Sequence, residues 1–146
     1  MRILSVDILE SETGILCDAV DCFGFWGAGL AKHLKYKYPK AFAEYEQVTN
    51  SSVAKRYYFL GTVKTTAVDN VVIASLFTQY DTSVAHRKTE YCAVIHAIKQ
   101  LADIERQLNL PVYIPFKMCC GLGGGDWNIV YSIIEAFLPN AIICQE

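Results

Sequence analysis

The sequence predicts an α/β domain in which helices cover both faces of a single sheet. Short apolar runs typical of strands alternate with amphipathic helical stretches along the whole chain, and this alternation is the pattern of layered α/β proteins. The 146 residues are enough for one domain with a substantial core. No repeat, linker or low-complexity segment interrupts the pattern. We therefore expect one domain that spans residues 1–146.

The first third of the chain is expected to form two strands and a broken helix. Residues 2–8 alternate between apolar and polar side chains, and residues 14–22 are apolar enough for a buried strand. Residues 30–48 have helical periodicity, and Pro39 is expected to start a second helical segment there because proline interrupts a helix. The apolar stripe of this stretch comprises Leu30, Leu34, Tyr38, Phe42 and Tyr45.

The remainder of the chain continues the alternation. Residues 56–66 and 69–78 predict a strand pair joined by a turn-like segment at 67–70. Residues 87–109 give the clearest helix, with an apolar stripe of Tyr91, Val94, Ile95, Ile98, Leu101, Ala102 and Leu108. A short buried strand, a helix and a last strand are expected at 111–116, 127–138 and 140–144.

Composition restricts the kinds of partner. Apolar residues make up 53% of the chain and charged residues 19%, which supports a packed core and excludes a disordered tail. The formal net charge is −2, so no overall field attracts nucleic acid and a nucleic-acid partner is not expected. An anionic ligand would have to be bound by local geometry.

The six cysteines predict neither disulfides nor a metal site. The chain has no Cys-x-x-Cys and no Cys/His cluster at zinc spacing, so neither a metal nor a cofactor is expected. Cys17, Cys92 and Cys144 stand in apolar runs, where a free thiol behaves as a small hydrophobe. The N-terminal residues lack a secretory apolar segment, and no 18-residue apolar stretch follows. We expect a cytoplasmic protein with reduced thiols and no membrane partner.

Two glycine-rich stretches follow expected strands and lead into expected helices. One lies at residues 24–30, "GFWGAGL", and the other at 117–130, "KMCCGLGGGDWNIV". Ligands of open α/β sheets bind at the carboxyl ends of strands, where helix N-termini present unpaired N–H groups to phosphate. Glycine permits close approach of the backbone and the positive φ that such N–H nests need. The two stretches therefore predict two walls of one cleft for a diphosphate; the alternative is two purely structural turns.

Four segments of the chain resemble the macrodomain family. They are residues 6–11 ("VDILES"), 21–39 ("DCFGFWGAGLAKHLKYKYP"), 73–79 ("IASLFTQ") and 114–127 ("IPFKMCCGLGGGDW"). The resemblance covers essentially the whole chain. Within the family, the chain is similar in particular to small stand-alone phage and bacterial proteins related to ADP-ribose-1''-phosphate phosphatases. It implies a three-layer α/β/α fold with a mixed central sheet, and an ADP-ribose cleft across the carboxyl ends of the central strands.

The resemblance also implies roles for individual residues. Asp7 would accept a hydrogen bond from the adenine amino group, with the Ile8 backbone beside it, unless it is a solvated strand-end acid. Phe77 would pack near the ligand or fill the core. The full set implied to bind ADP-ribose is Asp7, Ile8, Asp21, Cys22, Gly27, Ala28, Gly29, Leu30, Phe77, Cys120, Gly121, Leu122, Gly123, Gly124, Gly125 and Asp126.

Two acids are the candidates for catalysis. Asp21 stands where family members commonly have asparagine; an ionised aspartate accepts ribose hydroxyls but donates nothing, and its charge faces a diphosphate. Asp126, at the lip of the second glycine loop, either accepts a proton from an attacking water or caps the following helix. The strand end at 75–79 lacks the lysine that some relatives use to open the distal ribose covalently.

Other reactive side chains are given supporting roles. Trp127 is expected to anchor its loop by packing, with stacking on the ligand as the alternative. Cys119 and Cys120 lack a positioned histidine, which favours backbone donation over a nucleophilic thiol. Residues 86–88 (His-Arg-Lys) are expected to be solvated, with contact to an anionic substrate as the alternative, and His33 and His96 to lie in helices without a catalytic role.

The resemblance therefore implies a protein that binds ADP-ribose and removes phosphate from ADP-ribose 1''-phosphate through an activated water. A monomer is expected. One alternative is a non-catalytic ADP-ribose reader, and another is a hydrolase that releases ADP-ribose from modified protein or nucleic acid. The expected ligand is ADP-ribose or its 1''-phosphate, and the expected location is the cytoplasm of a bacterium or of a phage-infected host cell.

Overall fold

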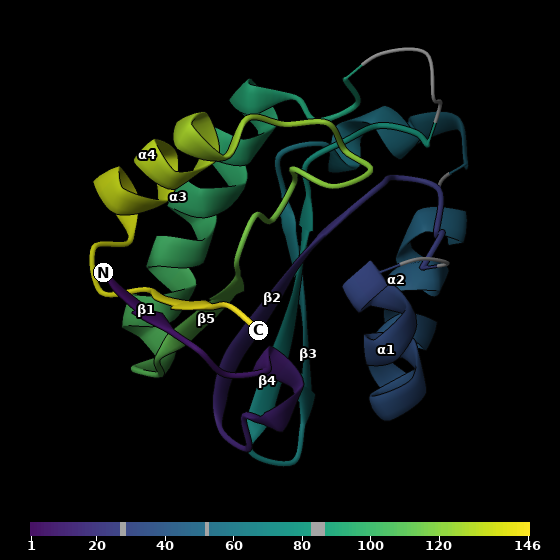
Figure 1. Ribbon diagram of the computed structural model, residues 1–146. Helices are drawn as coiled ribbons and strands as arrows, with labels where there is room; N and C mark the ends of the chain where they lie inside the picture. The colour runs from purple at the N-terminus through teal and green to yellow at the C-terminus, as the bar shows by residue number, and fades with distance from the viewer. Residues whose placement is uncertain (27–28, 52, 83–86) are drawn as a thin grey trace.

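The computed structural model describes residues 1–26, 29–51, 53–82 and 87–146 of the chain. In these residues the helices and strands follow the expected alternation (Figure 1). They are β1 (Arg2–Leu4), the 3₁₀ helix η1 (Ile8–Glu10), β2 (Gly14–Val20), α1 (Gly29–Lys37), α2 (Pro39–Ser51), the 3₁₀ helix η2 (Val53–Phe59), β3 (Val63–Val68), β4 (Val71–Phe77), α3 (Tyr91–Leu108), β5 (Val112–Pro115), α4 (Trp127–Phe137) and β6 (Ile142–Cys144).

The strands form one mixed sheet in the order β1-β6-β5-β2-β4-β3. All neighbouring pairs are parallel except β3 and β4, which form an antiparallel hairpin. β2 lies inside the sheet and pairs with both β4 and β5. Because parallel strands end at the same edge of a sheet, the segments that follow β2, β4 and β5 meet at one edge.

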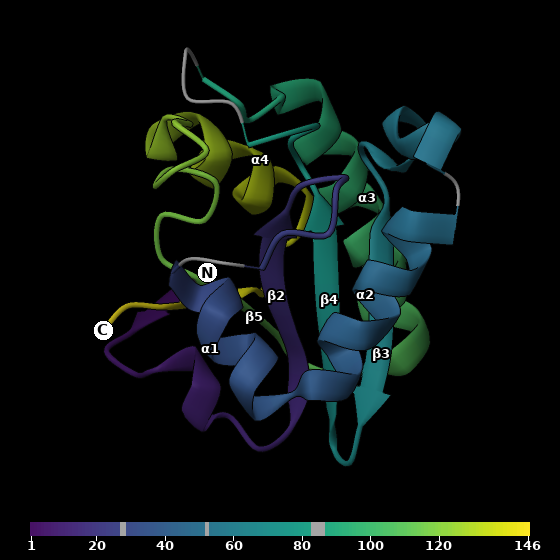
Figure 2. The ribbon, with the colours of Figure 1, turned by 90° about the vertical axis from the view of Figure 1, so that its right-hand side faces the viewer.

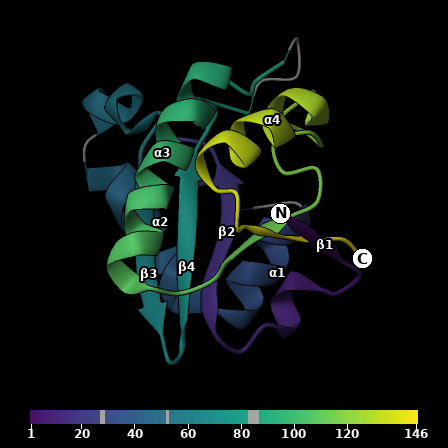
Figure 3. The same ribbon diagram turned by 90° about the vertical axis from the view of Figure 1, so that its left-hand side faces the viewer.

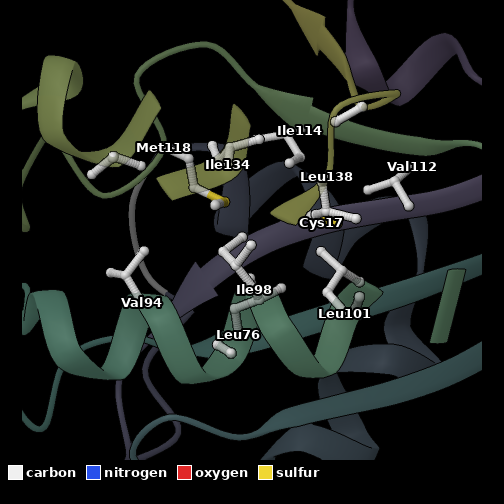
Figure 4. Packing of buried hydrophobic residues seen from close by; sticks show 14 of the residues in the cluster. Cys17, Leu76, Val94, Ile98, Leu101, Val112, Ile114, Met118, Ile134 and Leu138 are labelled. Carbon is white, nitrogen blue, oxygen red and sulfur yellow. The ribbon is translucent and has the colours of Figure 1, made fainter. Parts of the chain in front are cut away.

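Helices cover both faces of this sheet, as the three-layer prediction expected. α1 and α2 lie on one face (Figure 2), and α3 and α4 lie on the other (Figure 3). Each side has its own apolar core. In the core under α3 and α4, buried side chains of the sheet meet those of the helices (Figure 4), including Cys17, Leu76, Val94, Ile98, Leu101, Ile114, Ile134 and Leu138.

The alternation along β2 decides which side chains face which layer. Ile15 and Cys17 pack in the core under α3 and α4, whereas Leu16 and Val20 pack in the core on the α1 and α2 side. Successive side chains of a strand point to opposite faces. Asp18 therefore lies on the α1 and α2 face, between the two apolar side chains of that face.

Two expected strands are shorter than predicted. The run expected at 2–8 ends at Leu4, because Asp7 starts η1 by accepting a hydrogen bond from the N–H of Leu9 at 2.9 Å. The first half of the strand expected at 56–66 is instead η2, and β3 begins at Val63. In η2 the aromatic run serves packing rather than strand pairing, since the Phe59 ring lies 5.6 Å from that of Phe77.

The helix predictions are confirmed with small changes of boundary. Pro39 begins α2 as expected, and α3 begins at Tyr91 rather than at residue 87. Cys92 is exposed, so its assignment to an apolar environment was wrong, while Cys17 and Cys144 are buried. In the described part of the chain, we find no helix with the length and apolar character needed to cross a membrane.

Candidate functional site

One cleft opens at the sheet edge where β2 and β5 end. Its volume is about 470 Å³. Both glycine loops contribute to it, together with the start of α1 and the segment after β4. The described lining residues include Asp18, Val20, Asp21, Phe25, Trp26, Gly29, Leu30, Ala31, Gln79, Lys88, Pro115, Lys117, Met118, Gly121, Leu122 and Gly123. The prediction that the two loops form two walls of one cleft is thus confirmed.

Asp21 organises the loop that follows β2. Its Oδ1 accepts hydrogen bonds from the N–H of Phe23 at 2.7 Å and of Phe25 at 3.4 Å. The Tyr45 hydroxyl donates to the Asp21 carbonyl at 2.8 Å and lies 3.2 Å from the same Oδ1. Burial raises the pKa of Asp21, although these hydrogen bonds oppose the rise. The side chain predicted to contact a ribose is therefore also the clamp that shapes its own loop.

Trp26 closes the floor of the cleft beside this clamp. Its ring stacks on Tyr45 with ring centres 5.2 Å apart and lies 5.6 Å from Phe42. The side chain is buried, and its indole N–H has no hydrogen-bond partner among the described residues. A buried donor without an acceptor is uncommon in folded proteins and calls for an explanation.

The loop that follows β5 is fixed by its own backbone. The N–H of Gly125 donates to the Cys119 carbonyl at 2.9 Å, and the N–H of Cys120 donates to the Lys117 carbonyl at 2.9 Å. Lys117 and Cys119 have positive φ, as does Gly124 at +74°. The positive φ expected of a glycine nest is confirmed at Gly124.

The same loop is anchored to the segment that precedes α3. The backbone N–H groups of Lys88 and Thr89 both donate to the Gly123 carbonyl at 3.0 Å, and the Thr89 hydroxyl donates to the Cys119 carbonyl at 2.9 Å. A Cβ on Gly123 would lie 2.5 Å from Thr89 Oγ1 and 2.7 Å from the Cys119 oxygen. Only glycine fits here without displacing the anchor.

Several residues that line the cleft have backbone N–H groups without a partner in the described protein. Within the described residues, the N–H groups of residues 121–123 donate to no protein acceptor, and all three residues line the cleft. Opposite them, Gly29, Leu30 and Ala31 form the first turn of α1, whose N–H groups have no partner inside the helix. Two sets of residues with free backbone donors therefore line one space, and such donors can form an anion site.

Asp18 is a second buried acid of the cleft, which the sequence reasoning missed. It is 7% exposed, and its Oδ2 has no hydrogen-bond partner in the described structure. Burial raises the pKa of Asp18 to about 7, with a small opposing effect from the N–H of Ala19. The signal available in the sequence was an aspartate within the otherwise apolar run at 14–20.

The thiols near the cleft are poorly suited to nucleophilic attack. Burial raises the pKa values of Cys22 and Cys119 to about 12, and it also raises that of Cys120. These groups are therefore protonated at neutral pH, and a thiol is a weak nucleophile. This agrees with backbone donation as the role of the loop. Among the described residues, no three His, Cys, Asp or Glu side chains converge as a metal site would need.

The predicted ligand residues divide into those that line the cleft and those that do not. Asp21, Gly29, Leu30, Gly121, Leu122 and Gly123 are lining residues. Gly27 and Ala28 lie outside the described residues, as does His86. The other predicted residues are absent from the described lining: Asp7, Ile8, Cys22, Phe77, Cys120, Gly124, Gly125 and Asp126.

Three of these residues have evident structural roles. Phe77 is 1% exposed and packs against the rings of Tyr45 and Phe59, as its core alternative expected. Asp7 caps η1, and its charge raises the pKa of Glu146 near the C-terminus. Asp126 is the N-cap of α4, with its Oδ1 accepting from the N–H of Asn128 at 2.9 Å.

The packing role predicted for Trp127 is confirmed. Its ring lies 5.4 Å from that of Phe116 and 5.8 Å from that of Tyr131, both in edge-on geometry. The contact with Phe116 joins the start of the loop after β5 to the start of α4. The N–H of Asp126 is fixed in addition by the Tyr91 hydroxyl, at 2.9 Å.

An aromatic rim borders the cleft beyond the segment after β4. The rim consists of Phe23, Arg56, Tyr57 and Tyr80. Tyr80 lies 5.0 Å from Phe23 and 5.8 Å from Tyr57 between ring centres, and the Arg56 guanidinium covers the Phe23 ring at 4.7 Å. Tyr57 is 66% exposed. Tyr57 and Tyr80 line a second groove of about 600 Å³ that shares Lys88 with the cleft.

Comparison with proteins of known sequence gives two kinds of relative. No protein-family model matches the chain. A DNA ADP-ribosyl glycohydrolase of Mycobacterium tuberculosis is 25% identical over 142 residues, which cover 93% of this chain and 39% of that protein. The chain thus spans about two fifths of that relative's length. An ADP-ribose 1''-phosphate phosphatase of Candida albicans is 28% identical over 137 residues, covering 84% of this chain and 81% of that protein.

Solved structures share the fold. A macrodomain protein from Streptomyces coelicolor superposes with a TM-score of 0.81 at 22% identity, covering 99% of this chain and 97% of that one. The DarTG protein of Thermosipho africanus, solved in complex with ADP-ribose, matches with a TM-score of 0.78 at 18% identity, over 98% of this chain and 40% of that one. At these identities the structural matches establish the fold, and the site must be argued from its own residues.

Proposed function

Since the chain is a member of the macrodomain family, by its fold and its curated relatives, we propose that it binds ADP-ribose in the cleft and hydrolyses ADP-ribose 1''-phosphate to ADP-ribose and phosphate. The observation that carries the proposal is the pair of free backbone donor sets, at residues 121–123 and at the first turn of α1. Donors of this kind recognise the diphosphate that distinguishes ADP-ribose from AMP.

The charges of the cleft agree with a ligand held mainly by backbone. Lys88 and Lys117 line the cleft and supply positive charge, whereas Asp18 and Asp21 supply carboxyl groups. Each N–H bonded to a charged phosphate oxygen contributes about 1.5–3 kcal/mol. Several such bonds suffice for micromolar binding after the cost of association is subtracted.

Hydrolysis requires a water, a base and a leaving group. In the proposed reaction the water oxygen attacks the phosphorus of the 1''-phosphate, the P–O bond to the ribose breaks, and the ribose oxygen leaves with a proton. Asp126 and Asp21 are the proposed acid-base residues. Asp126 is exposed and has one oxygen committed to capping α4, so it can meet only the distal end of a ligand that extends past Gly123.

Two measurements test the proposal. Titration calorimetry should give clear binding of ADP-ribose and much weaker binding of AMP, because AMP lacks the second phosphate and the distal ribose. Equal affinity for the two ligands would remove the diphosphate cleft. Release of phosphate from ADP-ribose 1''-phosphate then separates an enzyme from a non-catalytic reader, which would bind without turnover.

A second candidate activity is release of ADP-ribose from modified nucleic acid. The aromatic rim favours it, since exposed rings with a neighbouring arginine are the surfaces on which unpaired bases stack. The Mycobacterium tuberculosis relative carries such a name. Incubation with ADP-ribosylated single-stranded DNA should release ADP-ribose if this candidate is right, and Tyr57→Ala should then reduce release without changing the affinity for free ADP-ribose.

A further inference from the structure

Asp18 occupies an unusual place for a carboxyl group. It lies in the interior strand β2, opposite Ser75 of β4 in the strand register, and on the face covered by α1 and α2. Its neighbours on that face of β2 are Leu16 and Val20. The side chain is 7% exposed and still lines the cleft, so it forms part of the floor on which a ligand would rest.

No cation of the described structure pairs with a negative charge at this position, and the N–H of Ala19 gives only partial compensation. The ion pairs of the described residues join Lys40 and Lys64 to Glu44 and Arg106 to Asp103, and none includes Asp18. Its Oδ2 is buried without a donor. A buried carboxylate without partners is costly, and such a group normally binds a proton instead.

The same floor contains a second unsatisfied atom. Within the residues described, the buried side-chain atoms that lack a hydrogen-bond partner are Asp18 Oδ2 and the indole nitrogen of Trp26. Both residues line the cleft. Their coincidence in one place indicates that this floor is arranged for an occupied cleft, since polar atoms left unpaired elsewhere in the fold would be scattered.

Few groups around Asp18 could take up a proton in its place near neutral pH. Its own strand contributes Cys17, on the opposite face, and the loop after β2 contributes Asp21. The loop after β5 contributes Lys117 and Cys119, and the segment before α3 contributes Lys88. α1 lines the cleft with Gly29, Leu30 and Ala31, which carry no charge, and β4 places Ser75 opposite. Burial raises the pKa values of both thiols far above neutrality, so they stay neutral.

We propose that Asp18 is a binding residue of the cleft that acts as a neutral carboxylic acid, and that an anionic ligand entering the cleft causes one proton to be taken up on this side chain. The inference rests on the proposed binding of ADP-ribose. A diphosphate above the floor places negative charge near the carboxyl, and like charge disfavours the ionised form. Burial already raises the pKa of Asp18 to about 7 in the empty cleft, so the free protein is partly ionised at neutral pH and the complex is not.

Proton uptake has a measurable consequence for affinity. If one proton is taken up for each ligand bound, the association constant falls about tenfold for each unit by which the pH is raised. We expect little change below pH 6.5, where Asp18 is already protonated, and a decline approaching tenfold per unit above pH 7.5. ADP-ribose is the suitable probe because its diphosphate is fully ionised and its adenine is neutral throughout this range, so the ligand itself takes up no proton.

Titration calorimetry of ADP-ribose at pH 7.5, repeated in PIPES, HEPES and Tris buffers, tests the proposal. Their ionisation enthalpies differ, so the slope of binding enthalpy against buffer enthalpy counts the protons taken up. Wild type should take up about 0.5–1 proton. Asp18→Asn has the same size and cannot ionise, and it should bind ADP-ribose without uptake and without the decline in affinity between pH 6.5 and 8.5. Asp21→Asn, the matched change in the other buried acid of the cleft, should retain the uptake.

Other results overturn the proposal. Binding of ADP-ribose without uptake in wild type would do so while leaving the proposed function intact. Uptake that survives in Asp18→Asn, or that disappears only in Asp21→Asn, would assign the proton elsewhere. If Asp18→Asn does not fold, the affinity of wild type against pH decides, and a flat profile from pH 6.5 to 8.5 rejects the proposal. Absence of binding in wild type rejects the proposed function and this inference together.

Discussion

Replacing Asp18 by asparagine should change how the stability of the protein depends on pH. Burial raises the pKa of this carboxyl from 3.8 to about 7. Between these two values the folded protein holds a proton that the unfolded chain has lost. The free energy of unfolding therefore falls as pH rises from about 3.8, and the loss is complete above about 7.

The magnitude follows from the same two numbers. Each pH unit within this window lowers the free energy of unfolding by about 1.36 kcal/mol. The whole window of about three units thus corresponds to about 4 kcal/mol, and the part between pH 5 and pH 7 to about 3 kcal/mol. Burying the amide of asparagine adds an offset of about 1–3 kcal/mol, but that offset does not vary with pH.

Urea denaturation at pH 5 and pH 8 measures the difference. The free energy of unfolding of wild type should fall by about 3 kcal/mol more than that of Asp18→Asn between the two pH values. The raised pKa of Asp21 contributes to both proteins and largely cancels. Parallel stability curves for wild type and Asp18→Asn would show that Asp18 is ionised in the folded protein, and the argument from burial would be refuted.

Three further substitutions, the first with a control variant, probe the loops and the clamp around the cleft. Gly124→Val should abolish ADP-ribose binding in calorimetry, because φ of +74° is unfavourable for a β-branched residue by at least about 1–2 kcal/mol and the added side chain meets Arg87; Gly121→Val, with open space and no positive φ, should keep the thermal stability of wild type. Asp126→Asn retains most of the cap of α4, so an acid-base role predicts turnover lower by about 10²–10⁴-fold with affinity kept, whereas lower thermal stability with unchanged turnover would leave only the cap. Tyr45→Phe removes the hydroxyl that clamps Asp21 and should lower the free energy of unfolding in urea by about 1–3 kcal/mol; an unchanged value would mean that solvent replaces the clamp.

The architecture and the position of the cleft could be predicted from the sequence because both depend on local signals. Hydrophobic periodicity located α2, α3 and α4, and strand-glycine-helix order located both loops. Parallel strands end at the same edge of a sheet, so both loops are expected at that edge. The failures were also local: the aromatic run at 56–59 is typical of a strand, but contacts with Phe77, which is distant in sequence, decide that it is helical.

The environment of individual side chains could not be predicted in this way. Asp21 was recognised as a site residue, but its hydrogen bonds to Phe23, Phe25 and Tyr45 depend on how the loop turns back on itself. Asp18 was missed because the predicted strand ran through it without any indication of whether this side chain is buried. Its burial depends on the pairing of β2 with two neighbours, which only the sheet order reveals.

Because the donors of the loop at 121–123 belong to the main chain, substitutions that arise in evolution or under an inhibitor can rarely remove them. No point substitution can delete a peptide N–H except replacement by proline, so an inhibitor that copies the diphosphate would rest on contacts that mutation cannot remove one at a time. Escape would have to act through the dihedral angles of the loop, at positions such as Gly123, where an added Cβ collides with Thr89. The side chains around this fixed frame, including the exposed Leu122, are left free to change with the ligand's outer groups.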